Sequence, residues 1–337
     1  MDKIPVQVEG RALTLTNLTK VLYPADGFTK AEVLDYYQRV SAMLLPHIAG
    51  RPMTLKRYPE GVDGEAFFQK HATAHRPDWI RTEDVVSHSS RARDPGATIS
   101  YLVIDDLPAL IWAANLAALE LHVPMWRFPR GALLASGGKA PPDPPMGGLP
   151  VPPYPPYPPG PPGPPASAEP DLLVFDLDPG APATVVECCR VAEGLRPLLE
   201  SEGLRPLAKT SGGKGLQLYA AISGLTAEQA TGQARSFAQR MEQELPDLVV
   251  SRMTKTLREG KVLIDWSQNN GSKTTVAPYS LRARAYPTVS TPVTWDEVAA
   301  CRHPDDLFFT APDVLNRIAE HGDLFAPLLP DSINRTP

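Results

Sequence analysis

The run Leu172–Gly180, LLVFDLDPG, is a short apolar strand that ends in two acids, and it decides how the rest of the sequence is interpreted. Because side chains alternate between the two faces of a strand, Asp176 and Asp178 point the same way, about 6.5 to 7 Å apart along the strand. A later apolar strand, Val262–Asp265, also ends in an acid. Three buried carboxylates are costly unless cations compensate them. Oxygen ligands favour Mg²⁺ or Mn²⁺, and paired ions about 3.5 to 4 Å apart are common in phosphoryl transfer.

These acids also have a simpler structural explanation, because Asp-x-Asp before Pro-Gly can end a strand with carboxylates that cap the following turn. A glycine-rich turn between the acids, Lys209–Tyr219 (KTSGGKGLQLY), favours the catalytic explanation. Its backbone N–H groups, one hydroxyl and the ammonium of Lys214 can hold a triphosphate. It is not a Walker A loop, because no Ser or Thr follows Lys214 and Leu216–Ala221 has the pattern of a strand. A flexible hairpin without a ligand is the alternative.

Seven stretches of the sequence resemble, in the same order, the polymerase domain of bacterial ligase D, which belongs to the archaeo-eukaryotic primase superfamily. They are Leu15–Pro24, Phe67–Lys70, Glu120–Pro124, Phe175–Gly180, Thr210–Gly215, Ile264–Asn269 and Lys273–Arg282. Only a proline-rich stretch falls outside the resemblance. The resemblance implies an α/β (α+β) fold with a primase-like catalytic core, in which an RNA-recognition-like sheet carries the acids and packs against a second sheet-containing lobe.

Composition agrees with one catalytic unit. The chain has 337 residues, of which 42% are hydrophobic, and this is enough for a sizeable core. No apolar run has the length of a membrane span and no signal segment opens the chain, so we expect a cytoplasmic, nucleoid-associated protein. Its cysteines, Cys188, Cys189 and Cys301, have neither disulfide-framework nor zinc-ligand spacing.

The formal charge of −5 is unusual for a protein that binds nucleic acid, but the charges are segregated. Acids gather on the expected helices and near the C-terminus, as on solvated faces. Bases gather near the motifs: Lys20, Lys30, Arg51, Lys56, Arg57, Lys255, Arg258, Lys261, Lys273, Arg282 and Arg284. We expect a basic groove on an acidic body, and DNA binding that weakens with salt.

The hydrophobic pattern predicts alternating strands and helices, which is typical of an α/β or α+β core. Expected strands lie at residues 11–16, 53–58, 99–104, around Ser211 and up to Asp265, and expected helices at residues 29–45, 107–121, 183–202 and 226–245. Three regions follow: an N-terminal lobe at residues 1–139, a proline-rich spacer at residues 140–170, and a catalytic lobe at residues 171–337. The resemblance implies that the N-terminal lobe carries DNA 5′-phosphate-binding elements. The spacer has the composition of an exposed polyproline II segment, and a docking site for an aromatic-lined partner is the alternative.

The catalytic roles follow from the chemistry of chain extension. One metal ion lowers the pKa of the 3′ hydroxyl and a second neutralises the leaving pyrophosphate, so two Mg²⁺ or Mn²⁺ ions held by Asp176, Asp178 and Asp265 would serve. The resemblance implies that the NTP or dNTP substrate binds to a further set of residues: Lys56, His122, Ser211, Lys214, Gln217, Gln268 and Arg282. Taken alone, His122 would be interpreted as a core histidine and Arg282 as a surface arginine.

The resemblance also implies DNA contacts. Lys20 and Lys30, with Asn17 beside them, match a pair that grips the 5′ phosphate on the downstream side of a gap. Phe67 and Phe68 match aromatic residues that lie against the template. Without the resemblance they would be interpreted as core phenylalanines. Arg258 lies in the loop Met253–Lys261, which resembles a loop that helps two broken ends meet, and Ser87–Thr98 resembles a second variable loop.

One position departs from the family pattern. The family motif Lys-Gly-x-His is Lys214-Gly215-Leu216-Gln217 here. Glutamine can donate a hydrogen bond but cannot carry a positive charge at neutral pH. We expect altered nucleotide affinity or sugar preference, with catalysis retained.

These observations predict a monomeric repair polymerase that adds nucleotides, preferentially ribonucleotides, at gaps or broken ends of double-stranded DNA with a downstream 5′ phosphate, in non-homologous end joining. No ligase or nuclease motif occurs up to Pro337, so we expect the end-binding protein Ku and a separate DNA ligase as partners. Short-gap filling in excision repair is one alternative. A catalytically weak DNA-end binding module is another.

Overall fold

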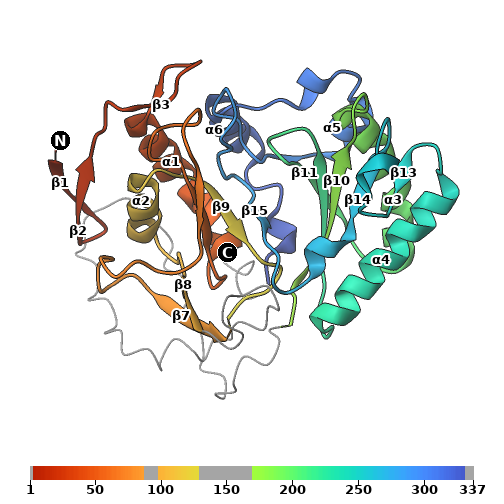
Figure 1. Ribbon diagram of the computed structural model, residues 1–337, viewed down its shortest axis with the longest axis horizontal. Coiled ribbons are helices and arrows are strands. Elements are labelled where there is room, and N and C mark those ends of the chain that lie inside the picture. The colour runs from red at the N-terminus through yellow and green to blue at the C-terminus, as the bar shows by residue number, and fades with distance from the viewer. Residues whose placement is uncertain (1–2, 87–97, 129–168, 331–337) are drawn as a thin grey trace.

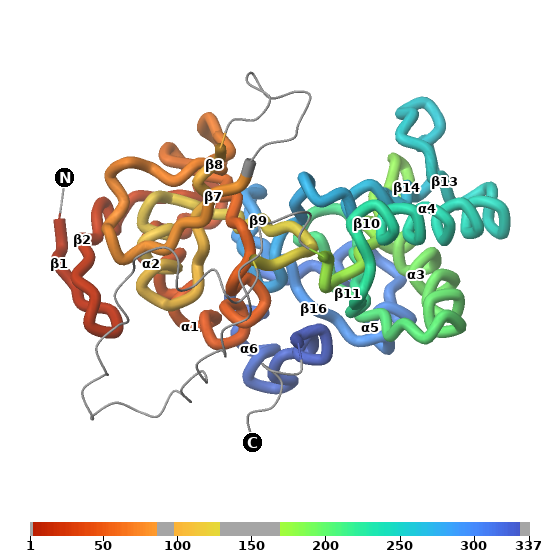
Figure 2. The backbone as a smooth tube through the Cα atoms, turned by 90° about the horizontal axis from the view of Figure 1, so that it is seen from below, coloured from red at the N-terminus to blue at the C-terminus, as the bar shows by residue number. Residues whose placement is uncertain are grey.

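The computed structural model describes residues 3–86, 98–128 and 169–330, which form two lobes side by side (Figure 1). The proline-rich stretch up to residue 168 and the loop at residues 87–97 lie outside the described residues. The first lobe contains β1 (Lys3–Val8), β2 (Arg11–Thr16), β3 (Val21–Tyr23), β4 (Phe28–Thr29), α1 (Lys30–Ile48), β5 (Thr54–Arg57), β6 (Phe67–Gln69), β7 (Thr82–Val86), β8 (Thr98–Leu102), α2 (Leu107–Asn115) and β9 (Ala118–Val123). The hairpin β1–β2 lies at the end of the molecule away from the second lobe (Figure 2).

Helix α1 forms as its sequence predicts. Thr29 caps it in a reciprocal capping box with Glu32, and an apolar face that includes Val33, Tyr37 and Val40 is fully buried. The helix continues to Ile48, one turn beyond the predicted end. It packs against α2 and supports the four-stranded sheet β15-β9-β5-β6, in which β15 (Thr275–Val276) comes from later in the chain.

The prediction of one helix over residues 107–121 is wrong. Asp106 caps α2, which ends at Asn115, and Ala117 adopts a positive φ of 58° before the chain continues as β9. An apolar run cannot by itself distinguish a buried helix from a buried strand, and this run contains both.

The second lobe is built on the six-stranded sheet β13-β14-β10-β12-β11-β16. Its elements are β10 (Leu172–Pro179), α3 (Val185–Ser201), β11 (Leu207–Thr210), β12 (Leu216–Ala221), α4 (Ala227–Glu244), β13 (Val249–Val250), the 3₁₀ helix η2 (Lys255–Leu257), β14 (Val262–Asp265), the 3₁₀ helix η3 (Trp266–Asn269) and β16 (Pro292–Val293). Leu173, Phe175 and Leu177 of β10 share a core with α3 and α4. Because side chains alternate, Asp176 and Asp178 point to the opposite face of this sheet.

The chain returns to the first lobe after η3. Strand β15 (Thr275–Val276) pairs with β9, and Tyr279, Leu281 and Val289 belong to the core of the first lobe. The remaining elements are α5 (Trp295–Ala300), η4 (Pro304–Leu307), α6 (Ala311–His321) and η5 (Ala326–Leu328). Figure 1 shows β15 and β9 between the lobes, next to the sheet that carries the acids. Cys188, Cys189 and Cys301 are buried free thiols. None of the described helices is long and apolar enough to cross a bilayer.

Candidate active site

The three acids lie on two paired strands of the second lobe. Asp176 of β10 is directly opposite Asp265 of β14 in the antiparallel register, and Asp178 follows two residues along β10. Asp265 is buried, Asp176 half-buried and Asp178 exposed. Burial and the neighbouring carboxylates raise the pKa of both Asp176 and Asp178, although a hydrogen bond from Gln217 opposes the shift at Asp176. The predicted clustering of the acids on one face is therefore present.

This mutual repulsion is the feature that fits a metal site. A divalent cation between the acids would stabilise their ionised forms, and all their donor atoms are the oxygens that Mg²⁺ and Mn²⁺ prefer. Across residues 3–86, 98–128 and 169–330, no three His, Cys, Asp or Glu side chains already form a metal cage. Hydrogen bonds from the residues that follow it fix the orientation of the Asp265 carboxylate. Its Oδ1 accepts hydrogen bonds from the backbone and hydroxyl of Ser267, its Oδ2 accepts one from Gln268 Nε2 at 3.0 Å, and Lys273 Nζ lies 3.9 Å away.

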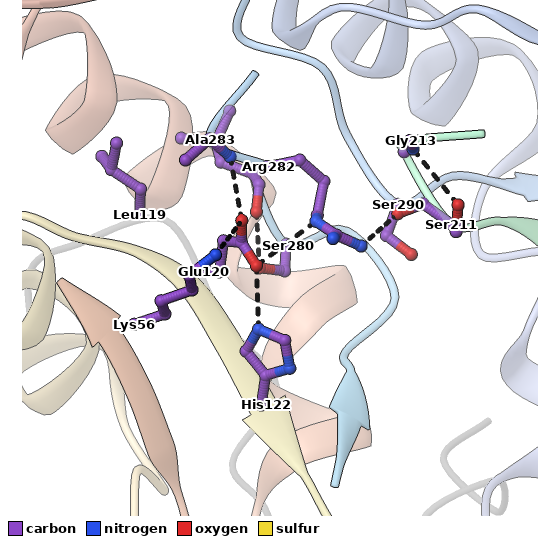
Figure 3. Close-up of polar contacts among 12 residues, drawn as sticks. Lys56, Leu119, Glu120, His122, Ser211, Gly213, Ser280, Arg282, Ala283 and Ser290 are labelled. Atoms are coloured by element: carbon purple, nitrogen blue, oxygen red, sulfur yellow. Dashed lines mark hydrogen bonds and ion pairs between the residues drawn. The ribbon is translucent and has the colours of Figure 1, made fainter. Parts of the chain in front are cut away.

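Glu120 of β9 gathers Lys56, His122 and Arg282 around its carboxylate (Figure 3). Its side chain is buried, and its carboxylate lies 3.7 Å from Lys56 Nζ, 2.9 Å from His122 Nε2 and 3.4 Å from Arg282 Nε. It also accepts a hydrogen bond from the backbone N–H of Ala283. Burial raises the pKa of Glu120, but the hydrogen bond from His122 and the charges of Arg282, His122 and Lys56 outweigh burial and lower this pKa to about 2.

His122 therefore lies on a strand, not at the end of a helix, and it is not an isolated core histidine. Burial and the charges of Arg282 and Lys56 lower the pKa of His122, although Glu120 opposes the shift. The 2.9 Å contact between His122 Nε2 and the Glu120 carboxylate orients the ring. Glu120 belongs to one of the stretches that resemble the family, but the sequence alone assigns it no role. A lone acid between leucines in an apolar strand was the available signal.

The glycine-rich turn is joined to this cluster by Arg282, whose Nη1 donates to the carbonyl of Ser211 at 2.5 Å. Ser211 Oγ accepts hydrogen bonds from the backbone N–H groups of Gly213 and Gly215, so the hydroxyl shapes the turn from inside. A side chain at Gly215 would lie 2.2 Å from the carbonyl oxygen of Leu177, which makes glycine necessary there. Lys214 is exposed at the tip.

Gln217 and a buried lysine complete the row of polar residues beside the acids. Gln217 Nε2 donates to Asp176 Oδ1 at 2.9 Å, and Gln217 Oε1 accepts from Lys209 Nζ at 2.5 Å. Lys209 has no exposed surface, and burial and the charge of Arg282 lower its pKa well below the usual value, although Asp176 opposes the shift. The sequence alone assigns Lys209 no role at the site. Its position in a strand directly before the glycine-rich turn was the only signal.

The lysines predicted to bind a 5′ phosphate lie together on the first lobe. Lys30 is 4% exposed and its Nζ donates to the carbonyl of Thr16 at 2.6 Å, while Lys20 forms an exposed ion pair with Glu60. Burial and the charges of Lys20 and Arg57 lower the pKa of Lys30 to about 8. Asn17 has a φ of 53° and begins the turn that leads to Lys20, whose backbone N–H donates to the Asn17 carbonyl. A bound anion would relieve the repulsion that Lys20 and Arg57 exert on Lys30.

The two phenylalanines of β6 are exposed, so the interpretation of them as core residues is wrong. Phe67 is 44% and Phe68 61% exposed. The Phe68 ring lies 5.8 Å from the His122 ring and 5.5 Å from Lys56 Nζ, next to the Glu120 cluster. Exposed aromatic side chains with adjacent cations are typical of surfaces that stack nucleic-acid bases.

Arg258 lies on a loop beside the acids. Its Nη2 donates to the carbonyl of Met253 at 2.8 Å, and its charge opposes the rise in the pKa of Asp178. The loop packs closely on β10, because a side chain at Gly180 would clash with the Arg258 carbonyl.

Comparison with known proteins agrees with this geometry. Residues 29–325 match the family model of the LigD primase-polymerase domain. Over 319 residues the chain is 42% identical to the multifunctional non-homologous end joining protein LigD of Mycolicibacterium smegmatis, covering 94% of this chain and 36% of the relative. It is 44% identical over 321 residues to LigD of Mycobacterium tuberculosis strain H37Rv, covering 95% of this chain and 37% of the relative.

A solved structure gives the same result. The polymerase domain from Mycobacterium tuberculosis ligase D in complex with DNA aligns with a TM-score of 0.77 at 43% identity, covering 94% of this chain and 97% of that one. The chain thus spans a little over a third of the length of the mycobacterial LigD proteins and nearly all of their polymerase domain. The predicted family and fold class are confirmed, and the chain belongs to the LigD primase-polymerase domain family, a family of nucleotidyltransferases.

Proposed function

We propose that the chain is a repair polymerase of non-homologous end joining, which extends a primer 3′ end at gaps or broken ends that carry a downstream 5′ phosphate. The observation that carries the proposal is that the two lobes bring paired acids and a cluster of basic side chains close together, since the charge of Arg282 acts on Asp178. Asp176 and Asp265 are paired across one sheet, and the other lobe brings Lys56 of β5, His122 of β9 and Arg282 together around Glu120. A triphosphate needs those cations, and the metal ions that accompany it need the acids.

Asp176, Asp178 and Asp265 are the residues that would hold two Mg²⁺ or Mn²⁺ ions. The ions would supply a lower pKa for the 3′ hydroxyl and charge neutralisation at the pyrophosphate. Gln268 and Ser267 orient Asp265 through its two oxygens, and Gln217 orients Asp176.

The nucleotide would lie between the glycine-rich turn and β9. Lys214 and Arg282 would contact the phosphates, with Ser211 shaping the turn. His122 and Lys56 are held by Glu120 on the facing strand. A preference for ribonucleotides is part of this proposal.

On the DNA, Lys20, Lys30 and Asn17 would hold the 5′ phosphate. Phe67 and Phe68 would stack against the template, and Arg258 would reach the opposing end. The solved relative was determined in complex with DNA, which supports DNA as the partner of this chain. Ku and a separate ligase are the partners that we propose for the later steps.

Primer extension on gapped DNA with Mn²⁺ tests the proposal. We expect one or a few nucleotides to be added, ATP to be used better than dATP, and a 5′-phosphorylated gap to be bound more tightly than an unphosphorylated gap at fixed salt. Binding without extension would instead support a DNA-end binding module. Equal affinity for the two gaps would contradict the phosphate site and favour gap filling that does not depend on that phosphate.

A further inference from the structure

Four polar residues form one row across four neighbouring strands of the catalytic sheet. In the strand registers, Lys209 of β11 is opposite Gln217 of β12, Gln217 is opposite Asp176 of β10, and Asp176 is opposite Asp265 of β14. The row runs from a lysine with no exposed surface to two of the acids proposed to hold metal.

The hydrogen bonds along the row have a fixed direction. Ser290 Oγ donates its hydrogen to the Thr210 carbonyl at 2.9 Å, so at its 2.6 Å contact with Lys209 Nζ it accepts. Lys209 Nζ also donates to Gln217 Oε1. Even an uncharged amine has two hydrogens, one for each of these oxygens. The hydroxyl of Tyr219 points to Gln217 Oε1 as well, at 3.3 Å.

This direction decides which end of the Gln217 amide faces the acids. With Oε1 facing Lys209, the Nε2 group faces Asp176 Oδ1 at 2.9 Å and donates to it. A reversed amide would place two oxygens in contact at Asp176 and would leave Lys209 facing hydrogens. Asp176 would then turn away from the position that pairs it with Asp265.

We propose that Lys209 is a positioning residue for the metal site, which acts through Gln217 by fixing the amide so that its N–H group holds Asp176 in place. This inference rests on the proposed function of the acids. In this lysine–glutamine pair the buried amine orients the amide donor, which a glutamine alone would not keep in one orientation. Substituting either member of the pair should have the same effect as substituting both.

Mn²⁺ binding by the full chain without nucleotide or DNA, measured by titration calorimetry, tests the pair. Lys209→Met and Gln217→Met keep side-chain volume, and each should weaken Mn²⁺ binding by at least about tenfold, which is about 1.4 kcal/mol. The double variant should be no weaker than either single variant. Ser290→Ala removes the other partner of Lys209 and is the control. It should change Mn²⁺ binding by less than about threefold, or 0.7 kcal/mol.

The outcomes separate this inference from the proposed function. If the wild-type chain and Asp176→Asn both fail to bind Mn²⁺, the metal site itself is wrong and the inference falls with it. If the wild type binds and Lys209→Met binds equally well, or if the two single losses add in the double variant, only the Lys209 role is overturned. If Lys209→Met does not fold, neutron diffraction from wild-type crystals decides, because it shows whether the hydrogens or the oxygen of the Gln217 amide face Asp176.

Discussion

The ionisation of the buried Lys30 tests the proposed 5′-phosphate site at the scale of a single residue. Its pKa of about 8 results from burial and from the charges of Lys20 and Arg57. Because only the protonated amine attracts phosphate strongly, we predict that the preference for a 5′-phosphorylated gap falls as the pH rises through about 8. Fluorescence anisotropy with phosphorylated and unphosphorylated gaps, at fixed salt over a pH range that brackets this value, measures it. Lys30→Met should remove the pH dependence, and a preference that is constant with pH would contradict the assignment.

The same group predicts a change in stability with the opposite sign. The pKa of Lys30 lies below the ordinary lysine value of 10.5, so between about pH 8 and 10.5 the unfolded chain binds more protons than the folded chain. The free energy of unfolding should therefore gain a contribution that rises with pH across this window. Urea unfolding of wild type and Lys30→Met measures the difference. If the free energy of unfolding has the same slope against pH in the two proteins, the pKa of Lys30 is not lowered in the folded chain.

Sequence predicted some residues better than others. The spacing of Asp176 and Asp178 on a strand and the resemblance together found the acids, because alternation on a strand is a local rule. Glu120 and Lys209 received no role, because their importance comes from partners on other strands. The structure shows that His122 and Arg282 both contact Glu120, and this contact cannot be derived from their positions in the sequence.

At the scale of elements, β9 carries a charge cluster whose stability depends on Glu120. We predict that Glu120→Gln lowers the free energy of unfolding by about 3 kcal/mol, because it leaves Lys56 and Arg282 without their shared counter-charge. Nucleotide affinity should fall as well, since Arg282 loses its anchor. Glu244→Gln breaks the exposed pair with Arg240 and is the matched control, with an expected change below about 1 kcal/mol. Equal changes for the two variants in urea unfolding would contradict the organising role of Glu120.

Strand β6 presents its two phenylalanines to solvent, so their removal should affect binding more than folding. We predict that Phe67→Ala and Phe68→Ala each weaken binding to gapped DNA by about 1 to 3 kcal/mol, the range for loss of one stacked base. Their thermal unfolding should change little, because both side chains are exposed. Phe308→Ala removes a similarly exposed aromatic on the other lobe and should leave DNA affinity unchanged. If the substitutions lower thermal stability but leave DNA affinity unchanged, the two phenylalanines stabilise the fold and do not bind DNA.

Element types were predicted well where one periodicity dominated. Helices α1, α3 and α4 were expected within a few residues of their observed bounds, because each has a capping threonine and an apolar face. The run through α2 and β9 was assigned to one helix because both elements are buried on all sides. Only the positive φ at Ala117 separates them, and alanine gives no sign of it.

At the scale of the whole molecule, the active site depends on the return of the chain to the first lobe. The segment after η3 adds β15 to the sheet of β9 and brings Arg282 to Glu120, while β10 and β14 hold the acids. Sequence order alone would place Arg282 in the catalytic lobe. The predicted start of the catalytic lobe at residue 171 remains a prediction. Residues after it also belong to the first lobe, because β15 pairs with β9 and Ala277, Tyr279, Leu281 and Val289 lie in the core of that lobe. Long-range pairing of this kind has no local sequence signal.

The central claim is that the paired acids catalyse extension, and single-turnover primer extension on 5′-phosphorylated gapped DNA with Mn²⁺ tests it most directly. Wild type should extend the primer, and Asp176→Asn and Asp265→Asn should each extend it at less than about a hundredth of that rate, a loss of more than about 2.7 kcal/mol. DNA binding should be nearly unchanged, because Lys20, Lys30 and the phenylalanines are intact. Either variant retaining more than about a hundredth of the wild-type rate would contradict the assignment of these acids as metal ligands.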